Sequence, residues 1–126
     1  MVGMICSTMA QTATTMPLAA GDTAVNTGTA SKVIKATAGY SGIVVQAKAT
    51  ELTGTSGGSI KMQGSLDGVA YEDIGSSYTV TDVASQTKTF YILAPLPVYI
   101  RVLQTGTGTM SSVLSVKYVL RKYQTD

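Results

Sequence analysis

The sequence predicts an all-β protein, an antiparallel β-sandwich or jelly-roll-like domain of about seven or eight strands with an extended N-terminal arm. Three observations predict this fold. Alternating apolar and polar residues recur in short runs, turn residues such as Gly, Asp and Pro separate the runs, and no segment repeats apolar residues at helical spacing. Strands at such intervals are typical of sandwiches and barrels rather than of alternating strands and helices.

The first expected strands lie between residues 32 and 83. Their ranges are 32–38, 42–52, 59–68, 69–74 and 78–83. In the third of these runs Ile60, Met62 and Leu66 share one face, which we expect to be buried. Asp67 and Gly68 supply the dipeptide of a tight hairpin turn, so the following run is the expected return strand.

Three further strands are expected at residues 87–93, 98–104 and 111–123. Each alternates: Phe90 and Ile92 face one way in the first of them, for example, and Thr89, Tyr91 and Leu93 face the other. The last two runs flank an uncharged linker of Thr, Gly and Met. Glycine supplies the positive φ that a tight loop needs, so the sequence predicts a hairpin here.

A chain of 126 residues is one domain by length, and we divide it into an arm, residues 1–30, and a sandwich, residues 31–126. The arm has Asp22 as its single charge and is interrupted by Pro17. It forms either a loose tail or a segment that lies across a neighbouring subunit. Charged residues make up 13% of the chain, against about 25% in typical globular proteins, so part of the surface is expected to be covered by a partner.

Composition argues against several classes of partner and compartment. The net charge is +2 and the nine basic residues are dispersed, which predicts no direct binding of nucleic acid. No stretch approaches the roughly 18 consecutive apolar residues that span a bilayer, and the N-terminus lacks the basic start of a secretory signal. The sequence therefore predicts no membrane partner and no secretion by that route.

The sequence offers no catalytic constellation. Histidine is absent, and the single cysteine, Cys6, has no basic neighbour to activate it. The local carboxylate cluster of Asp67, Glu72 and Asp73 suits either a Ca²⁺ or acid/base role or, as we favour, a turn and solvent-facing side chains. The last two are consecutive on an expected strand and so point to opposite faces. We therefore predict no enzyme, no catalytic, cofactor-binding or metal site, and no cofactor.

A sugar-binding module is a competing interpretation, because exposed aromatic rings are the usual platform for sugars. The chain has seven tyrosines, one phenylalanine and no tryptophan. The tyrosines best placed for this role are Tyr40, Tyr71, Tyr78 and Tyr99. The alternative is that these rings complete the rim of the core with their hydroxyl groups in water.

Two segments carry a resemblance to a known group of proteins. "QGSLDGVAYEDI" (63–74) is similar to a hairpin of small virion proteins of tailed phages, with Tyr71 where Trp is usual, and "YIRVLQTGTGTMSSVLSVKYVLRK" (99–122) resembles the C-terminal ending of phage structural proteins. The resemblance implies a capsid-associated or other virion β-domain. Its partners would be the major capsid protein or other virion subunits, in a homo-oligomer or many-copy assembly, and its location the capsid surface after synthesis in the host cytoplasm.

From these observations we expect a non-enzymatic auxiliary or decoration (cement) protein that binds the capsid of a tailed phage and stabilises the shell. The alternatives are a carbohydrate-binding or host-adhesion module of a head fibre or tail, and a tail or connector component. The expected partner-binding residues lie in the arm and in the Thr/Gly linker. They are Met4, Ile5, Met9, Met16, Leu18, Thr107, Thr109 and Met110.

Overall fold

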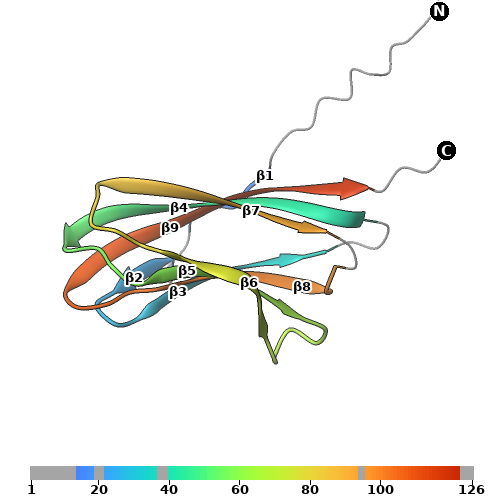
Figure 1. Ribbon diagram of the computed structural model, residues 1–126, viewed down its shortest axis with the longest axis horizontal. Helices are drawn as coiled ribbons and strands as arrows, with labels where there is room; N and C mark the ends of the chain where they lie inside the picture. The colour runs from blue at the N-terminus through green and yellow to red at the C-terminus, as the bar shows by residue number, and fades with distance from the viewer. Residues whose placement is uncertain (1–13, 19–21, 37–39, 94–95, 123–126) are drawn as a thin grey trace, which may run out of the picture.

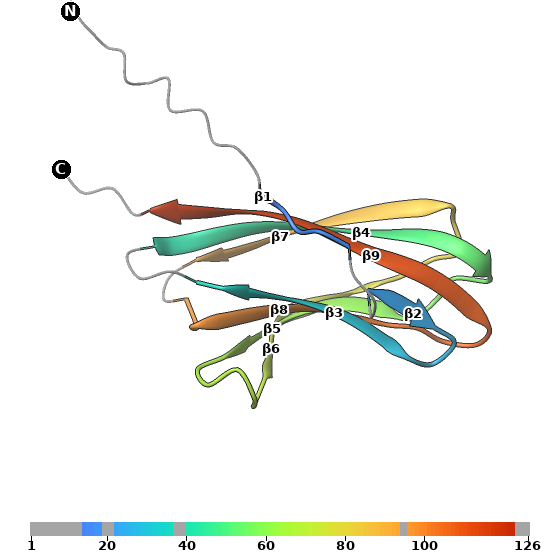
Figure 2. The same cartoon turned by 180° about the vertical axis from the view of Figure 1, so that it is seen from behind.

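The computed structural model describes residues 14–18, 22–36, 40–93 and 96–122, which form two antiparallel sheets packed face to face (Figures 1 and 2). The strands are β1 (Thr14–Thr15), β2 (Thr23–Val25), β3 (Thr29–Lys35), β4 (Tyr40–Gly54), β5 (Ser59–Ser65), β6 (Glu72–Thr79), β7 (Ser85–Leu93), β8 (Tyr99–Thr105) and β9 (Met110–Lys122). The predicted all-β sandwich is confirmed. In the part of the chain that the structure describes, no helix is long and apolar enough to cross a membrane.

Strands that follow one another in the sequence often belong to different sheets. In the first sheet the order is β1-β9-β4-β7, and β2 also pairs with β9. In the second sheet the order is β3-β8-β5-β6. Long β4 and β9 form the centre of the first sheet, and β8 and β5 form the centre of the second. The predicted strand positions therefore hold for most of the chain, while the pairing of the strands emerges only in the structure.

The core lies between the sheets and is built by the alternation seen in the sequence. On the first sheet the buried residues include Ile43, Val45, Leu114 and Val116, and on the second they include Ile60, Met62, Ile100 and Val102. Phe90 and Ile92 on β7 are also buried, as the alternation predicted. Full burial of each such side chain contributes about 1.5–3 kcal/mol, so this layer is the main source of stability.

The C-terminal hairpin predicted from alternation is wrong, because β8 and β9 belong to different sheets. The connection between them is an arch that crosses from one sheet to the other, and the apolar faces of the two strands meet across the core. Near the arch, buried Gln104 donates a hydrogen bond from Nε2 to Oγ of buried Ser112, at 3.1 Å. Gly108 supplies a positive φ of 67° in the linker, as the sequence predicted.

The segment after β5 also departs from the prediction. Separate strands at 69–74 and 78–83 are replaced by one strand, β6, which begins at Glu72 and ends at Thr79. Residues 66–71 form a loop rather than a two-residue turn. The physical reason is the side chain of Asp67, which accepts hydrogen bonds from the backbone of the loop and so satisfies it without strand pairing.

The N-terminal segment forms part of the sandwich where the structure describes it. β1 and β2, which fall inside the expected arm of residues 1–30, pair with β9, and buried Ala24 belongs to the core. Lys32 of β3 points into the core and forms a 2.6 Å ion pair with Asp22, and its ammonium group also donates to the carbonyl of Pro17. The chain's own N-terminal residues thus close one side of the sandwich.

Candidate functional site

The opposite side of the sandwich is open. Its edges are β7 of the first sheet and β6 of the second, and each pairs on one side only, with β4 and β5 respectively. Residues of both edges line the same two hollows, which share Ile74 and Ile92. We call this region the open side. An unpaired strand edge presents backbone N–H and C=O groups that another chain can bind.

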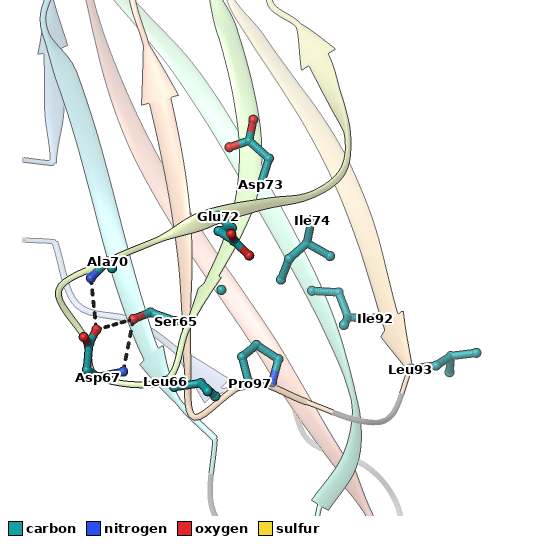
Figure 3. Close-up of a pocket in the computed structure, with 11 residues that line it drawn as sticks. Ser65, Leu66, Asp67, Ala70, Glu72, Asp73, Ile74, Ile92, Leu93 and Pro97 are labelled. Carbon is teal, nitrogen blue, oxygen red and sulfur yellow. Dashed lines mark hydrogen bonds between the residues drawn. The ribbon is translucent and has the colours of Figure 1, made fainter.

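A groove of about 590 Å³ lies at one end of the open side; we call it the open-side groove. Its apolar lining is Leu66, Ala70, Ile74, Ile92, Leu93 and Pro97, and its carboxylates are Asp67, Glu72 and Asp73. Figure 3 shows Ile74 and Ile92 pointing toward one another from β6 and β7. The groove thus combines an apolar floor with acidic side chains at its rim.

Two features of the sequence shape this groove. Gly64 allows close packing, because a Cβ at this position would lie 2.7 Å from Cγ of Pro97 and 2.9 Å from Cδ1 of Ile74. Leu66, which the sequence placed on the core face, is 77% exposed because β5 ends at Ser65. Leu93, at the end of β7, is 82% exposed. The groove is therefore flanked by large apolar side chains in contact with water.

The loop that borders the groove is organised by Asp67 and Ser65. Oδ1 of Asp67 accepts hydrogen bonds from the N–H groups of Val69 and Ala70, at 2.8 and 3.0 Å. It also accepts one from the Ser65 hydroxyl, at 2.9 Å. The bonds from Ala70 and Val69, and then that from Ser65, lower the pKa of Asp67 from 3.8 to about 2. The Asp67 carboxylate therefore stays ionised at ordinary pH.

Acid should weaken this loop. The folded pKa of Asp67, about 2, lies below its unfolded value, so its stabilising effect is present above about pH 4 and lost as the pH falls toward 2. Asp67→Asn should lack this part of the pH dependence. Thermal unfolding followed by circular dichroism between pH 2 and 5 measures the difference, with Glu72→Gln, at the start of β6, as the control. Identical pH profiles for wild type and Asp67→Asn would contradict the assignment.

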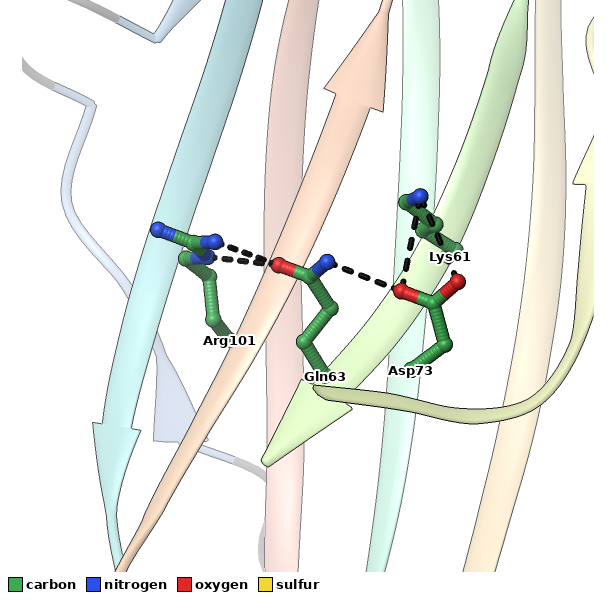
Figure 4. A network of polar contacts seen from close by, with 4 residues as sticks. All are labelled: Lys61, Gln63, Asp73 and Arg101. Carbon is green, nitrogen blue, oxygen red and sulfur yellow. Dashed lines mark hydrogen bonds and ion pairs between the residues drawn. The ribbon is translucent and has the colours of Figure 1, made fainter. Parts of the chain in front are cut away.

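A second candidate surface is a row of polar side chains on the outer face of the second sheet (Figure 4). Arg101 donates from Nε and Nη2 to Oε1 of Gln63, and Nε2 of Gln63 donates to Asp73, at 2.9 Å. Lys61 lies 3.4 Å from Asp73. The hydrogen bond from Gln63, and then Lys61, lowers the pKa of Asp73. We call these four residues the polar row.

An aromatic ring adjoins the polar row. The guanidinium carbon of Arg101 lies 4.0 Å from the ring centre of Tyr71, which is a cation–π contact. Tyr99 on the same sheet lies 5.9 Å from the ammonium group of Lys35. Tyr78 is half-buried and donates to Oε1 of Gln86. Of the tyrosines proposed for sugar binding, the structure thus places Tyr71 beside fixed polar groups, while the side chain of Tyr40 lies outside its description.

The predicted partner-binding residues that the structure describes differ in their exposure. Leu18 is 60% exposed, but Met16 is half-buried against the core and Met110 is 2% exposed. Thr107 and Thr109 are exposed in the arch between β8 and β9. Met4, Ile5 and Met9 lie outside the described residues. The sequence did not identify the groove, although its acidic segment, with Leu66 just before Asp67, marked the loop that borders it.

The acidic segment does not assemble a metal site in the described part of the chain, where no three Asp, Glu, Cys or His side chains are grouped to hold an ion. Asp67 is turned to its own loop, and Asp73 is directed toward Gln63 and Lys61. The carboxylates therefore contribute charge to the rim of the groove rather than a ligand cage.

No family model and no curated protein matches the chain. Among solved structures it is similar to the CBM22-1 xylan-binding domain of Paenibacillus barcinonensis Xyn10C, with 13% identity, a TM-score of 0.48 and coverage of 67% of this chain and 58% of that domain, which is less than two-thirds of its length. It is also similar to a CBM4 structure, with 13% identity, a TM-score of 0.48 and coverage of 93% and 82%. A family 16 carbohydrate-binding module has 12% identity, a TM-score of 0.45 and coverage of 73% and 70%. At these identities and scores, no ligand or binding residue is carried over to this chain.

Proposed function

We propose that the protein is a non-catalytic structural protein that attaches to a larger assembly through its open side. The observation that carries the proposal is the difference between the two sides of the sandwich. On one side the chain's own N-terminal segment adds β1 and β2 to β9 and bonds to Lys32 of the edge strand β3, whereas on the other side the edges of β6 and β7 border the open-side groove. Unpaired edges are a hazard in an isolated protein and serve as contacts in an assembly.

The assembly we propose is the virion of a tailed phage, in which the protein is an auxiliary or decoration protein on the capsid. The resemblance in residues 63–74 and 99–122 and the low charge of the chain support this proposal. Attachment would be driven by burial of apolar surface. At about 25 cal/mol per Å², each 100 Å² contributes about 2.5 kcal/mol before the cost of ordering, and many weak contacts over a shell add together.

Binding to isolated phage heads that lack the protein tests this function. The full chain should bind at regular stoichiometry in co-sedimentation. The double variant Leu66→Ser/Leu93→Ser should bind at least tenfold more weakly, because it removes two exposed leucines from the groove without adding charge. The matched control is Val25→Ser/Leu52→Ser, which makes the same kind of change at exposed positions outside the groove. Failure of the wild-type chain to bind heads overturns the virion assignment, and equal binding of both double variants overturns the role of the open side.

A second candidate function, carbohydrate binding, is favoured by the contact of Tyr71 with Arg101. Planar polar groups held in place by mutual hydrogen bonds can recognise the hydroxyl groups of a sugar, and an aromatic ring can support its apolar face. On a glycan array, Tyr71→Ala should then lose binding that Tyr91→Ala keeps, since Tyr91 is 74% exposed on the other sheet. Absence of binding by the wild-type chain removes this candidate.

A further inference from the structure

The two unpaired edges of the open side differ in regularity. β7 pairs with β4 over nine consecutive positions, from Leu93 opposite Gly42 to Ser85 opposite Thr50, with no register shift. β6 is irregular, because its register with β5 shifts between Ile60 and Met62 and Gly75 has a φ of 71°. Bulges of this kind prevent an edge from adding a further strand. The regular edge of β7 is therefore the place where a strand can be added.

Apolar residues line one half of this edge. Phe90 and Ile92 point inward from β7, and Ile74 approaches Ile92 from β6 (Figure 3). Side chains at alternate positions of an added strand would extend this inward layer. This apolar stretch ends at Lys88, because Lys88 is on the same inward-facing side of β7 as Phe90 and is exposed along the open side. The apolar part of the edge thus runs from Thr89 to Leu93.

The charges beside Thr89–Leu93 indicate the charge that a bound segment should carry. The carboxylates of Asp67, Glu72 and Asp73 line the open-side groove; Lys61 pairs with Asp73, and Lys88 lies at the other hollow, so Asp67 and Glu72 carry the acidic character of the groove. Hydrogen bonds from the loop backbone favour the ionised form of Asp67. An extended segment with Lys or Arg beside its apolar residues is complementary to such a rim, whereas an acidic segment is repelled.

We propose that β7 binds, along Thr89–Leu93, an extended apolar segment of a partner protein flanked by basic residues, added as a further strand beside the acidic groove. The inference rests on the proposed function and names the chemistry of its partner. Residues 1–13 of this chain carry no charge, the segment 119–122 pairs with β4, and in the segment 32–35 Lys32 is buried against Asp22. The ligand therefore comes from a different protein.

Fluorescence anisotropy with labelled, blocked peptides tests this proposal on the full chain. The probe is Lys-Val-Thr-Val-Thr-Val-Arg, and the control has Glu in place of both terminal basic residues. The basic-flanked peptide should bind at least tenfold more tightly, and methylation of alternate backbone nitrogens, in the set that faces β7, should weaken it at least tenfold. Leu66→Ser/Leu93→Ser should also weaken binding about tenfold, while Val25→Ser/Leu52→Ser should not.

Amide hydrogen exchange identifies where on the protein the peptide binds. Addition of the basic-flanked peptide should slow exchange within Thr89–Leu93. Equal affinity for basic- and acid-flanked peptides, no binding, or slowing confined to β6 or to the polar row overturns the inference. The two proposals fail separately. Peptide binding without binding to phage heads removes the virion assignment alone, whereas head binding that the peptide does not inhibit removes the partner chemistry alone.

Discussion

Replacing Lys32 with methionine should lower the free energy of unfolding by about 3–5 kcal/mol, because it leaves the carboxylate of Asp22 buried without its cation. Both charged side chains are buried in the described part of the chain. Lys32 is 9% exposed and Asp22 is 6% exposed, and Nζ of Lys32 lies 2.6 Å from Oδ2 of Asp22. The ammonium group also donates to the carbonyl of Pro17, so the variant loses a second bond to the N-terminal segment. Urea unfolding followed by circular dichroism measures the loss.

Two controls make this prediction specific. Lys48→Met changes an exposed lysine on β4 in the same way and should leave the unfolding midpoint near that of wild type. The double variant Lys32→Met/Asp22→Asn should recover part of the stability, because the buried charge is then removed. If Lys32→Met is as stable as Lys48→Met, the ion pair does not fasten the N-terminal segment to β3.

Gly58→Ala should destabilise the fold by more than about 3 kcal/mol, well beyond the effect of a positive φ alone. Gly58 has a φ of 99°, and a Cβ at this position would overlap the carbonyl oxygen of Thr105 at the end of β8. Because the added Cβ would meet backbone rather than a flexible side chain, the overlap cannot be relieved by a change of rotamer. The measurement is the thermal unfolding midpoint, converted with the unfolding enthalpy.

Gly108→Ala is the matched control for this glycine. Its φ of 67° is also positive, but nothing lies within 4 Å of an added Cβ. It should cost only about 1 kcal/mol, the ordinary penalty for a left-handed residue. Equal losses in the two variants would show that β5 does not begin in close contact with the end of β8.

The sequence predicted the strands well where they are long and half-buried. Phe90 and Ile92 alternate with exposed Tyr91 and Leu93 as expected, because a strand between core and water must place its apolar residues on one face. Alternation does not reveal which sheet a strand joins. The pattern of residues 97–123 suits a hairpin and an arch equally, since in both cases the two apolar faces turn toward the core.

Local side-chain bonds explain the other differences. The hydrogen bonds of Asp67 extend the turn after β5, which displaces the start of β6 and exposes Leu66. β1 and β2 are too short to show alternation, and their place in the first sheet depends on pairing with distant β9. The open-side groove likewise combines residues of β5, β6, β7 and the loop after β7, a juxtaposition that no local pattern encodes.

The most direct test of attachment through the open side is amide hydrogen exchange of the full chain, free and bound to phage heads. Exchange within Thr89–Leu93 of β7 should be slower in the bound protein, because these edge amides would be covered by the partner. Exchange in β3, the edge strand on the closed side, should be unchanged. Unchanged exchange in Thr89–Leu93, with slowing confined to β3 or to the polar row, would contradict attachment through the open side.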